Sequence, residues 1–355
     1  MNKLNVAVIF GGVSPEHEVS LASAATIIGC MSQERYNIIP VYITREGKWL
    51  LYDGQIENIR NISWERLGTP AVLSPEKGGS LLRVVGDKVK RVLVDVVFPA
   101  LHGANGEDGT IQGLFELAGI PYVGCGVLAS AVCMDKSFTK LIARSLKLNQ
   151  TPYVCLTAGE FRANPRILRG AAVKLGYPCF VKPAGAGSSV GITKAGNKKE
   201  LTAAVSEALK YDRKAVIEKA VAGRELEVSV LGGDGEVSVS RVGEIIPARE
   251  FYDYEAKYND AGSKTVTAPE LPAGVEDEIR EAAARIFAAV DGYGLARVDF
   301  FLDNENGVIF NEINTFPGFT PISMYPMLWE ESGLPKEELV DRLIGLAMKR
   351  AKANG

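Results

Sequence analysis

Hydrophobic positions in the first third of the chain alternate between strand-like runs and helix-like spacing. The apolar runs at 4–10 and 37–43 predict buried strands, and residues 16–31 between them predict a helix. Further elements are expected as hairpins and loops at 45–90, a strand at 92–101, a helix at 108–118 and a short strand at 120–124. Strands that alternate with helices predict a parallel sheet with helices on its faces.

The rest of the chain has a mixed pattern, typical of an α+β fold. A strand, a glycine loop and a second strand fill 179–195, and two antiparallel strands meet at the turn Gly233-Asp234-Gly235. The remaining elements expected are helices at 135–148, 198–211, 275–290 and 336–349 and a strand at 215–221. The polar, aromatic stretch at 247–272 has no pattern of its own, and loops of that length are often lids.

Composition indicates a soluble globular protein of two or three domains. The 355 residues are 46% hydrophobic and 23% charged, and the longest apolar runs are too short to cross a membrane. The net charge of −3 gives no excess of basic residues that would indicate nucleic acid or an anionic membrane as a partner. The start MNKLNVAVIF leads directly into a strand pattern without a signal-peptide cleavage region, which predicts a cytoplasmic protein.

Cysteine and histidine usage narrows the chemistry. The five cysteines are scattered and odd in number, which favours buried free thiols: Cys30, Cys125, Cys133, Cys155 and Cys179. His17 and His102 are the only histidines in the sequence, too few for a histidine zinc site and an unpromising basis for a Ser-His-Asp triad. Catalysis is therefore expected to use carboxylates, lysines, arginines and the backbone.

Residues 296–315 predict a hairpin with charged side chains on one face. Alternate residues of a strand share a face, so Arg297 and Asp299 point the same way, as do Glu312 and Asn314. If the turn closes with Asp303 opposite Val308, Asp299 faces Glu312 and Arg297 faces Asn314.

Two carboxylates that face each other in a sheet require a cation. Arg297 could supply it in an ordinary salt bridge. Oxygen ligands from Asp, Glu and Asn also suit Mg²⁺, which proteins usually hold through one or two carboxylates and substrate phosphates. Because the irregular loop TFPGFTPIS follows directly, we favour a metal and substrate site.

The segment 182–191, KPAGAGSSVG, is a glycine loop between two strands. Glycines let backbone N–H groups turn toward an anion, and Lys182 and Lys136 could reach phosphate. An ordinary flexible hairpin with solvated lysines is the alternative. The segment 124–129 also fits the G-x-G-x-x-A dinucleotide fingerprint, but the second strand and its acidic residue are missing, so an NAD site is disfavoured.

Motifs along nearly the whole chain resemble the D-alanine:D-alanine ligases of the ATP-grasp superfamily. They run in family order as GGVSPEHEVSL, ALHGANGEDGTIQG, CMDK, FVKPAGAGSSVGITK, IEKAVAGRELEVSVL, FYDYEAKY, ARVDFFL and NEINTFPGFTPISMYP. The resemblance implies a three-domain fold: a Rossmann-like N-terminal substrate domain (1–124), a central ATP-grasp subdomain with the glycine loop (125–218), and a C-terminal ATP-grasp subdomain with the lid and the metal hairpin (219–355).

The resemblance implies ATP-dependent joining of two D-alanines through an acyl phosphate for peptidoglycan synthesis, by a homodimer. It implies two Mg²⁺ ions, replaceable by Mn²⁺, on Asp299, Glu312 and Asn314. The implied nucleotide contacts are phosphate at Lys136, Lys182 and Lys257, adenine at Glu218, Lys219, Ala220 and Val221, and ribose at Glu225. The implied catalytic residues are Glu16, Ser188, Tyr258, Arg297 and Gly318, with His102, Ser323 and Met324 at the substrates.

Several of these residues also have ordinary structural interpretations. Glu16 follows Ser14-Pro15 and would suit the first turn of a helix, with Ser14 as the cap. His102 could make a local hydrogen bond at a strand end, Ser188 could be a small loop residue, and Met324 could be a core residue.

The residues leave more than one second substrate open. Tyr258 and Met324 favour D-alanine, because related lactate ligases typically carry His and Arg there. The pair Pro321-Ile322 departs from the small or polar pair expected, so D-serine or D-lactate remains an alternative. Another ATP-grasp ligase and a regulator without catalysis are further alternatives, although Arg297, Asp299, Glu312 and Asn314 are all present, which weighs against the regulator.

Overall fold

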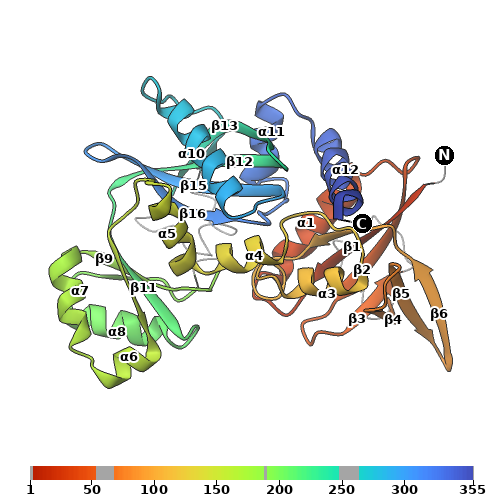
Figure 1. Cartoon of the computed structure of the whole chain (residues 1–355), viewed down its shortest axis with the longest axis horizontal. Coiled ribbons are helices and arrows are strands. Elements are labelled where there is room, and N and C mark those ends of the chain that lie inside the picture. The colour runs from red at the N-terminus through yellow and green to blue at the C-terminus, as the bar shows by residue number, and fades with distance from the viewer. Residues whose placement is uncertain (1–2, 53–67, 188–189, 248–263, 355) are drawn as a thin grey trace.

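The computed structural model describes residues 3–52, 68–187, 190–247 and 264–354, which form three β-sheets with helices around them (Figure 1). The N-terminal sheet, the small central sheet and the C-terminal sheet have seven, four and five strands. This mixed α/β architecture with a parallel segment near the N-terminus agrees with the fold class expected from the sequence.

The N-terminal sheet has a parallel part and an antiparallel part. Its strands lie in the order β6 (Lys88–Leu93), β5 (Ser80–Val85), β4 (Gly68–Leu73), β3 (Trp49–Tyr52), β2 (Tyr36–Ile43), β1 (Leu4–Gly11) and β7 (Val96–Ala100). β1 pairs in parallel with β2 and β7, whereas β3 to β6 add antiparallel hairpins. Helices α1 (His17–Cys30) and α3 (Thr110–Ala118) belong to this region. The expected hairpins at 45–90 therefore extend the same sheet.

Two strand predictions in this region were wrong. Residues 92–101 form the end of β6 and all of β7, because the chain turns at Asp95, whose carboxylate accepts a hydrogen bond from the Asn5 N–H at 2.7 Å. The expected strand at 120–124 is reduced to a single parallel bridge between Tyr122 and Val97.

The central sheet contains the two strands that flank the glycine loop. Its strands lie in the order β10 (Thr193–Ala195), β9 (Cys179–Pro183), β11 (Lys214–Lys219) and β8 (Tyr153–Thr157), with helices α6 (Ala158–Ala163), α7 (Ile167–Leu175) and α8 (Lys198–Ala208). No element was predicted between 149 and 178. The start of α6 nevertheless carries a capping box, in which Thr157 and Glu160 satisfy each other's backbone N–H groups.

The C-terminal sheet carries the predicted charged hairpin. Its strands lie in the order β14 (Lys264–Val266), β13 (Glu236–Ile246), β12 (Gly223–Gly233), β15 (Gly294–Asp303) and β16 (Gly307–Asn314). The turn between β12 and β13 lies where it was predicted, with positive φ at Asp234 and Gly235. Helices α10 (Val275–Ala289), α11 (Met324–Glu331) and α12 (Lys336–Asn354) follow the chain order. The sequence did not predict α11, and α12 is longer than expected.

Helices α4 (Val127–Met134) and α5 (Lys136–Ser145) connect the three sheets. The predicted helix at 135–148 is α5, which begins after Asp135, whereas α4 was not predicted. α4 begins after Gly126 and is followed directly by α5, so the strand that a dinucleotide fold needs does not come next. Buried residues of both helices share one hydrophobic core with the C-terminal sheet.

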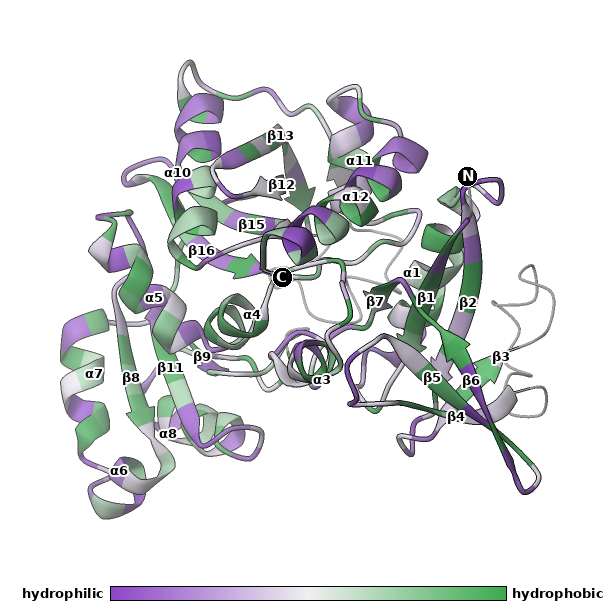
Figure 2. Cartoon of the chain, turned by 45° about the vertical axis from the view of Figure 1, so that its right-hand side comes forward, coloured by the Kyte–Doolittle hydropathy of each residue, from purple (hydrophilic) through white to green (hydrophobic). Residues whose placement is uncertain are grey.

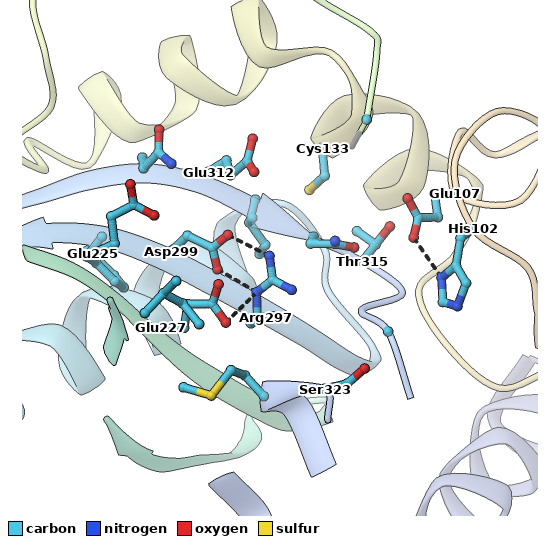
Figure 3. A pocket seen from close by; sticks show the side chains of 18 of the residues that line it. His102, Glu107, Cys133, Glu225, Glu227, Arg297, Asp299, Glu312, Thr315 and Ser323 are labelled. Atoms are coloured by element: carbon cyan, nitrogen blue, oxygen red, sulfur yellow. Dashed lines mark hydrogen bonds and ion pairs between the residues drawn. The ribbon is translucent and has the colours of Figure 1, made fainter. Parts of the chain in front are cut away.

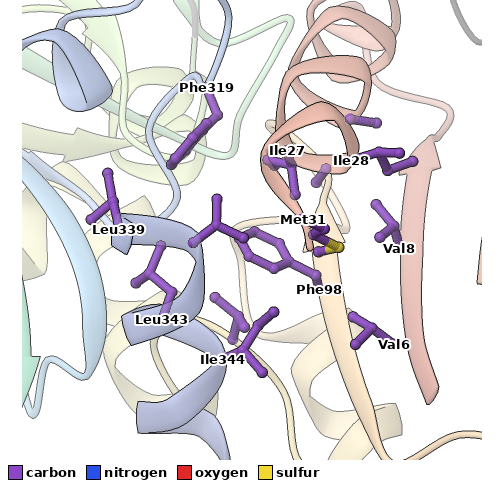
Figure 4. Close-up of a cluster of buried hydrophobic side chains, with 14 of the residues drawn as sticks. Val6, Val8, Ile27, Ile28, Met31, Phe98, Phe319, Leu339, Leu343 and Ile344 are labelled. Atoms are coloured by element: carbon purple, nitrogen blue, oxygen red, sulfur yellow. The ribbon is translucent and has the colours of Figure 1, made fainter. Parts of the chain in front are cut away.

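The two ends of the chain meet in one hydrophobic core. Leu339, Leu343 and Ile344 of α12 pack toward Phe98 of β7 and Ile27 of α1 (Figure 4). This packing covers the α1 face of the N-terminal sheet, and α12 shows hydrophilic residues among hydrophobic ones as expected for a half-covered helix (Figure 2). Among the described residues, no helix has the length and hydrophobicity needed to span a bilayer.

The core is reinforced by Arg350 near the end of α12. Its guanidinium lies 4.2 Å from the ring centroid of Tyr122 and 4.8 Å from that of Tyr293, and it donates hydrogen bonds to the carbonyls of Tyr122 and Gly124 at 2.9 Å. The C-terminal helix is thereby fixed to the segment where the chain leaves the N-terminal sheet.

Candidate active site

A polar cavity lies where the three sheets meet, and most of the predicted site residues line it (Figure 3). Residues that reach it come from all parts of the chain: Glu16 before α1, His102 after β7, Lys136 of α5, Lys182 of β9, Asp299 of β15 and Ser323 before α11. The predicted lid residue Lys257, together with Ser188 and Tyr258, lies outside the described residues.

The β15–β16 hairpin has the predicted opposed charges but a different closing register. Asp299 lies opposite Glu312 and Arg297 opposite Asn314, as expected. The assumption that Asp303 faces Val308 was wrong, because Asp303 pairs with Gly307. One extra residue at position 311 forms a β-bulge between these two parts of the ladder and restores the expected pairing.

Arg297 is held by two carboxylates in the cavity. Its Nε and Nη2 donate to Oδ1 and Oδ2 of Asp299, both at 2.7 Å, and Nε lies 3.2 Å from Oε2 of Glu227. Burial by itself lowers the pKa of Arg297, but the charges of Asp299 and Glu227 outweigh it and hold that pKa well above its ordinary value. Glu227 was not predicted, although its alternation with Glu225 along β12 places both on the cavity side.

The donor set at the hairpin fits magnesium in its chemistry. Asp299, Glu312 and Asn314 offer oxygen ligands at one end of the hairpin, where they line the cavity. In the part of the chain that the structure describes, no three Asp, Glu, His or Cys side chains are gathered closely enough to form a metal cage. The bidentate pair with Arg297 holds the Asp299 carboxylate, so Asp299 would have to turn to take part in binding an ion.

Lys182, which was predicted to contact phosphate, forms a buried ion triad with Glu218 and Lys140. Nζ of Lys182 lies 2.7 Å from Oε2 of Glu218, and Nζ of Lys140 lies 2.5 Å from Oε1 of the same carboxylate. Burial by itself raises the pKa of Glu218, but the two ammonium groups outweigh it and hold that pKa well below its usual range. Lys140 was missed by the sequence reasoning, although it follows Lys136 by one helical turn.

Of the other predicted nucleotide residues, Lys136 and Glu225 line the cavity, whereas Lys219, Ala220 and Val221 are not among its lining residues. Nζ of Lys136 donates to the carbonyl of Ala186 in the glycine loop at 2.9 Å and lies 3.6 Å from Oε2 of Glu312. Lys219 is the last residue of β11, and Ala220 follows it with its N–H on the carbonyl of Pro178. Val221 comes before β12, and Glu225 of β12 lines the cavity.

His102 is buried in a hydrogen-bond network at the N-terminal side of the cavity. Its Nε2 lies 2.9 Å from Oγ of Ser23, and its Nδ1 lies 3.2 Å from the carbonyl of Phe316 and 3.5 Å from Oε1 of Glu107. Burial by itself lowers the pKa of His102, but the hydrogen bond and charge of Glu107 outweigh it, so that pKa lies above its ordinary value. The network joins α1 to the loop after β16.

Glu16 reaches the cavity from the turn before α1. A Cβ added to Gly103 would lie 2.5 Å from Oε2 of Glu16, and one added to Gly187 would lie 3.4 Å from it. Glu16 therefore sits between the loop after β7 and the glycine loop. The expected Ser14 cap was wrong: α1 begins at His17 after Glu16 and has no side-chain cap, and Oγ of Ser14 instead accepts a hydrogen bond from the Glu16 N–H at 3.1 Å in the turn before the helix.

The loop after β16 ends in a small polar pocket at the start of α11. Oγ of Ser323 accepts a hydrogen bond from the Thr320 N–H at 2.9 Å, and a Cβ on Gly318 would lie 2.9 Å from that oxygen. Met324 lines the cavity but is also buried against Ile245 and Leu328. Both the substrate and the core interpretation of Met324 are thus compatible with its position.

Two family models together match most of the chain. The model described as D-ala D-ala ligase N-terminus matches residues 5–125, and the model described as D-ala D-ala ligase C-terminus matches residues 142–345.

Similar proteins match over nearly their full length. A D-alanine--D-alanine ligase from Caldicellulosiruptor bescii is 50% identical over 99% of this chain and 96% of its own. The solved D-Ala:D-Ser ligase VanG from Enterococcus faecalis is 40% identical with a TM-score of 0.89, covering 98% of this chain and 100% of its own. The D-alanine-D-alanine ligase structure from Coxiella burnetii is 36% identical with a TM-score of 0.89, covering 100% and 96%.

Proposed function

Because the chain belongs to the D-alanine–D-alanine ligase family and is an ATP-dependent ligase, we propose that it joins two D-alanine molecules and forms ADP and phosphate. The observation that carries the proposal is the convergence of Arg297, Lys136 and the opposed pair Asp299–Glu312 on one cavity. That combination suits activation of a carboxylate by phosphoryl transfer, which needs charge neutralisation and alignment more than a covalent nucleophile.

The first step requires the γ-phosphoryl group to meet a carboxylate. Magnesium bound by Asp299, Glu312 and Asn314 would supply charge neutralisation for the phosphates. Lys136 and Lys182 would bind phosphate oxygens, for which Lys182 would leave the Glu218 carboxylate. Lys140 would remain on Glu218, so the buried charge would keep a partner. Glu218 to Val221 would border the adenine and Glu225 the ribose.

The second step is attack of an amine on the acyl phosphate. The tetrahedral oxyanion would be stabilised by Arg297, which stays charged throughout, and by the N–H of Gly318. Glu16 would bind the ammonium of the first D-alanine, with Ser188 and Tyr258 in support. Lys257 and Tyr258 belong to the proposed lid, whose closure would exclude water from the acyl phosphate. His102, Ser323 and Met324 would seat the second D-alanine.

A phosphate-release assay with ATP, Mg²⁺ and D-alanine tests this proposal. Release that depends on D-alanine and yields D-alanyl-D-alanine supports it. Release with another acceptor acid but not with D-alanine would contradict it, and bound ATP without release would favour a regulator.

The likeness to the D-Ala:D-Ser ligase makes D-serine the second candidate acceptor. Ile322, which is 63% exposed, lines the cavity together with its chain neighbour Ser323. We propose D-alanine as the preferred acceptor because Met324 gives that pocket an apolar wall. Product analysis with equal D-alanine, D-serine and D-lactate at neutral pH decides between them.

The resemblance also supports several proposals about the whole protein. We propose two bound ions, with Mn²⁺ as a substitute, a homodimer, a cytoplasmic location and a role in peptidoglycan precursor synthesis. We propose domains at 1–124, 125–218 and 219–355; each corresponds to one of the three sheets, although β11 of the central sheet ends at Lys219, one residue beyond the second boundary.

A further inference from the structure

Asp299 and Arg297 have conflicting tasks under the proposed function, on which this inference rests. Asp299 is a proposed magnesium ligand, yet both its carboxylate oxygens accept hydrogen bonds from Arg297 at 2.7 Å. When Asp299 turns to an ion, Arg297 loses its two strongest hydrogen bonds. Arg297 must nevertheless stay in place, because its guanidinium is the proposed oxyanion donor, and such donors act only when held in position.

Glu227 lies close enough to Arg297 to hold it when Asp299 turns to the ion. It is on β12, directly opposite Asp299 of β15, and its Oε2 lies 3.2 Å from the Arg297 Nε (Figure 3). Glu227 is only 9% exposed, so its charge is poorly screened by water. Among the described residues, the acidic side chains in ion-pair contact with Arg297 are Asp299 and Glu227.

The cross-strand pairing places Glu227 in a row of carboxylates. Glu227, Asp299 and Glu312 occupy directly opposite positions on the neighbouring strands β12, β15 and β16. Like charges at opposite positions of a sheet repel each other. Arg297 lies in ion-pair contact with Glu227 and Asp299, and Nζ of Lys136 lies 3.6 Å from Oε2 of Glu312, so added positive charge from a metal ion beside Asp299 and Glu312 would relieve this repulsion further.

We propose that Glu227 is a positioning residue that keeps the Arg297 guanidinium in the cavity when Asp299 turns to magnesium. Arg297 passes from a shared contact with two carboxylates to a contact with Glu227 alone. Glu227 also weakens the hold of Arg297 on Asp299, because both carboxylates compete for the same Nε. Metal binding is thereby easier than it would be with Asp299 as the sole partner of Arg297.

The variant Glu227→Gln tests this inference, because it keeps the side-chain size and removes the charge. Free and bound Mn²⁺ are measured by electron paramagnetic resonance with ADP present, and the Mg²⁺ dependence of phosphate release is measured alongside. We expect Mn²⁺ binding to weaken about tenfold, because a buried charge in ion-pair contact with Arg297 is removed, and kcat to fall. Glu227→Asp keeps the charge and should restore part of both.

Glu276→Gln is the matched control. Glu276 forms a similar pair with Arg241, with an Nε–Oε1 distance of 2.7 Å, but between α10 and β13 and outside the cavity lining. Its removal should leave Mn²⁺ binding unchanged. Circular dichroism and the thermal midpoint verify that both variants fold; if Glu227→Gln does not fold, the comparison of Glu227→Asp with wild type gives the answer from the same measurements.

Two results would overturn the inference. Wild-type Mn²⁺ affinity in a folded Glu227→Gln variant would show that Glu227 does not influence the metal. Loss of a whole Mn²⁺ site, equal to that in Asp299→Asn, would make Glu227 a ligand and not a positioning residue. The Mn²⁺ binding measurement uses ADP and needs no D-alanine. If the wild-type enzyme releases no phosphate in response to D-alanine, the proposed reaction is contradicted. The effect of Glu227 on Mn²⁺ binding can still be measured in that case.

Discussion

Arg297 donates hydrogen bonds to both carboxylate oxygens of Asp299, two residues further along the same strand, at 2.7 Å each. Arginine can form this pair because its guanidinium presents parallel N–H groups to a carboxylate. The same planar group suits a developing oxyanion, so its geometry matters as well as its charge.

Arg297→Lys should keep the charge and lose this geometry. We expect kcat/KM for D-alanine to fall about a hundredfold or more, the effect of losing one oxyanion donor. Initial rates of phosphate release measure it. Arg241→Lys, at an arginine paired with Glu276 outside the cavity, is the control and should leave the rates unchanged. Near-normal rates in Arg297→Lys would exclude a role for the guanidinium fork.

Glu218→Gln should destabilise the protein strongly at neutral pH. The change leaves Lys140 and Lys182 without their buried carboxylate, and breaking a buried ion pair in this way costs about 3–5 kcal/mol. Urea unfolding measures the loss. Glu207→Gln, at an exposed carboxylate paired with Lys210, is the control and should not change the midpoint detectably.

The effect of Glu218→Gln should depend on pH in a defined direction. The pKa of Glu218 is held well below its ordinary value of 4.5 in the folded protein. Its contribution to stability is therefore complete above about pH 4.5 and is lost as the pH falls through the folded pKa. The gap in urea midpoint between wild type and variant should narrow below pH 4.5. A difference in urea midpoint that widens as the pH falls would contradict a stabilising role for the ion triad at Glu218.

Gly103→Ala should weaken binding of the first substrate. Gly103 has φ +70°, and a Cβ there would lie 2.5 Å from Oε2 of Glu16 and 2.6 Å from Oγ of Ser14, so Glu16 has to move. We expect the KM for D-alanine at the first site to rise at least about tenfold, the effect expected when a charged hydrogen bond is lost. Gly86→Ala is the matched control, because Gly86 has φ +58° and nothing within 4 Å of its added Cβ. Equal effects of the two variants on KM would mean that backbone strain alone is responsible.

Ser23→Ala should loosen the loop that carries Gly318. The Ser23 hydroxyl contacts His102 Nε2 at 2.9 Å and accepts a hydrogen bond from the Phe319 N–H at 3.1 Å. Without it we expect the KM for D-alanine to rise about five- to tenfold while the KM for ATP changes little, consistent with one or two hydrogen bonds. Steady-state kinetics with each substrate varied measure this. Ser206→Ala, on the surface helix α8, should change neither constant.

The sequence alone determined the charged hairpin, because strand alternation is a local property. Arg297 with Asp299, and Glu312 with Asn314, share a face whatever the rest of the fold does. The assumed turn register was off by one residue, and the bulge at position 311 compensated for it. The strand and helix patterns likewise sufficed for β1, an apolar run buried on both faces, for the largely buried helix α1, and for α10, which buries one face.

Only the tertiary structure decided which distant charges meet. Nothing local in the sequence indicates that Glu227 of β12 faces Asp299 of β15, or that Lys140 of α5 and Lys182 of β9 share the Glu218 carboxylate, because strand order and helix docking set these contacts. Helix α4 was also missed, since its apolar residues pack against a sheet formed much later in the chain. Local periodicity thus gives the elements and their faces, whereas the ion pairs at this cavity depend on contacts between distant segments, such as that of Lys136 with Glu312.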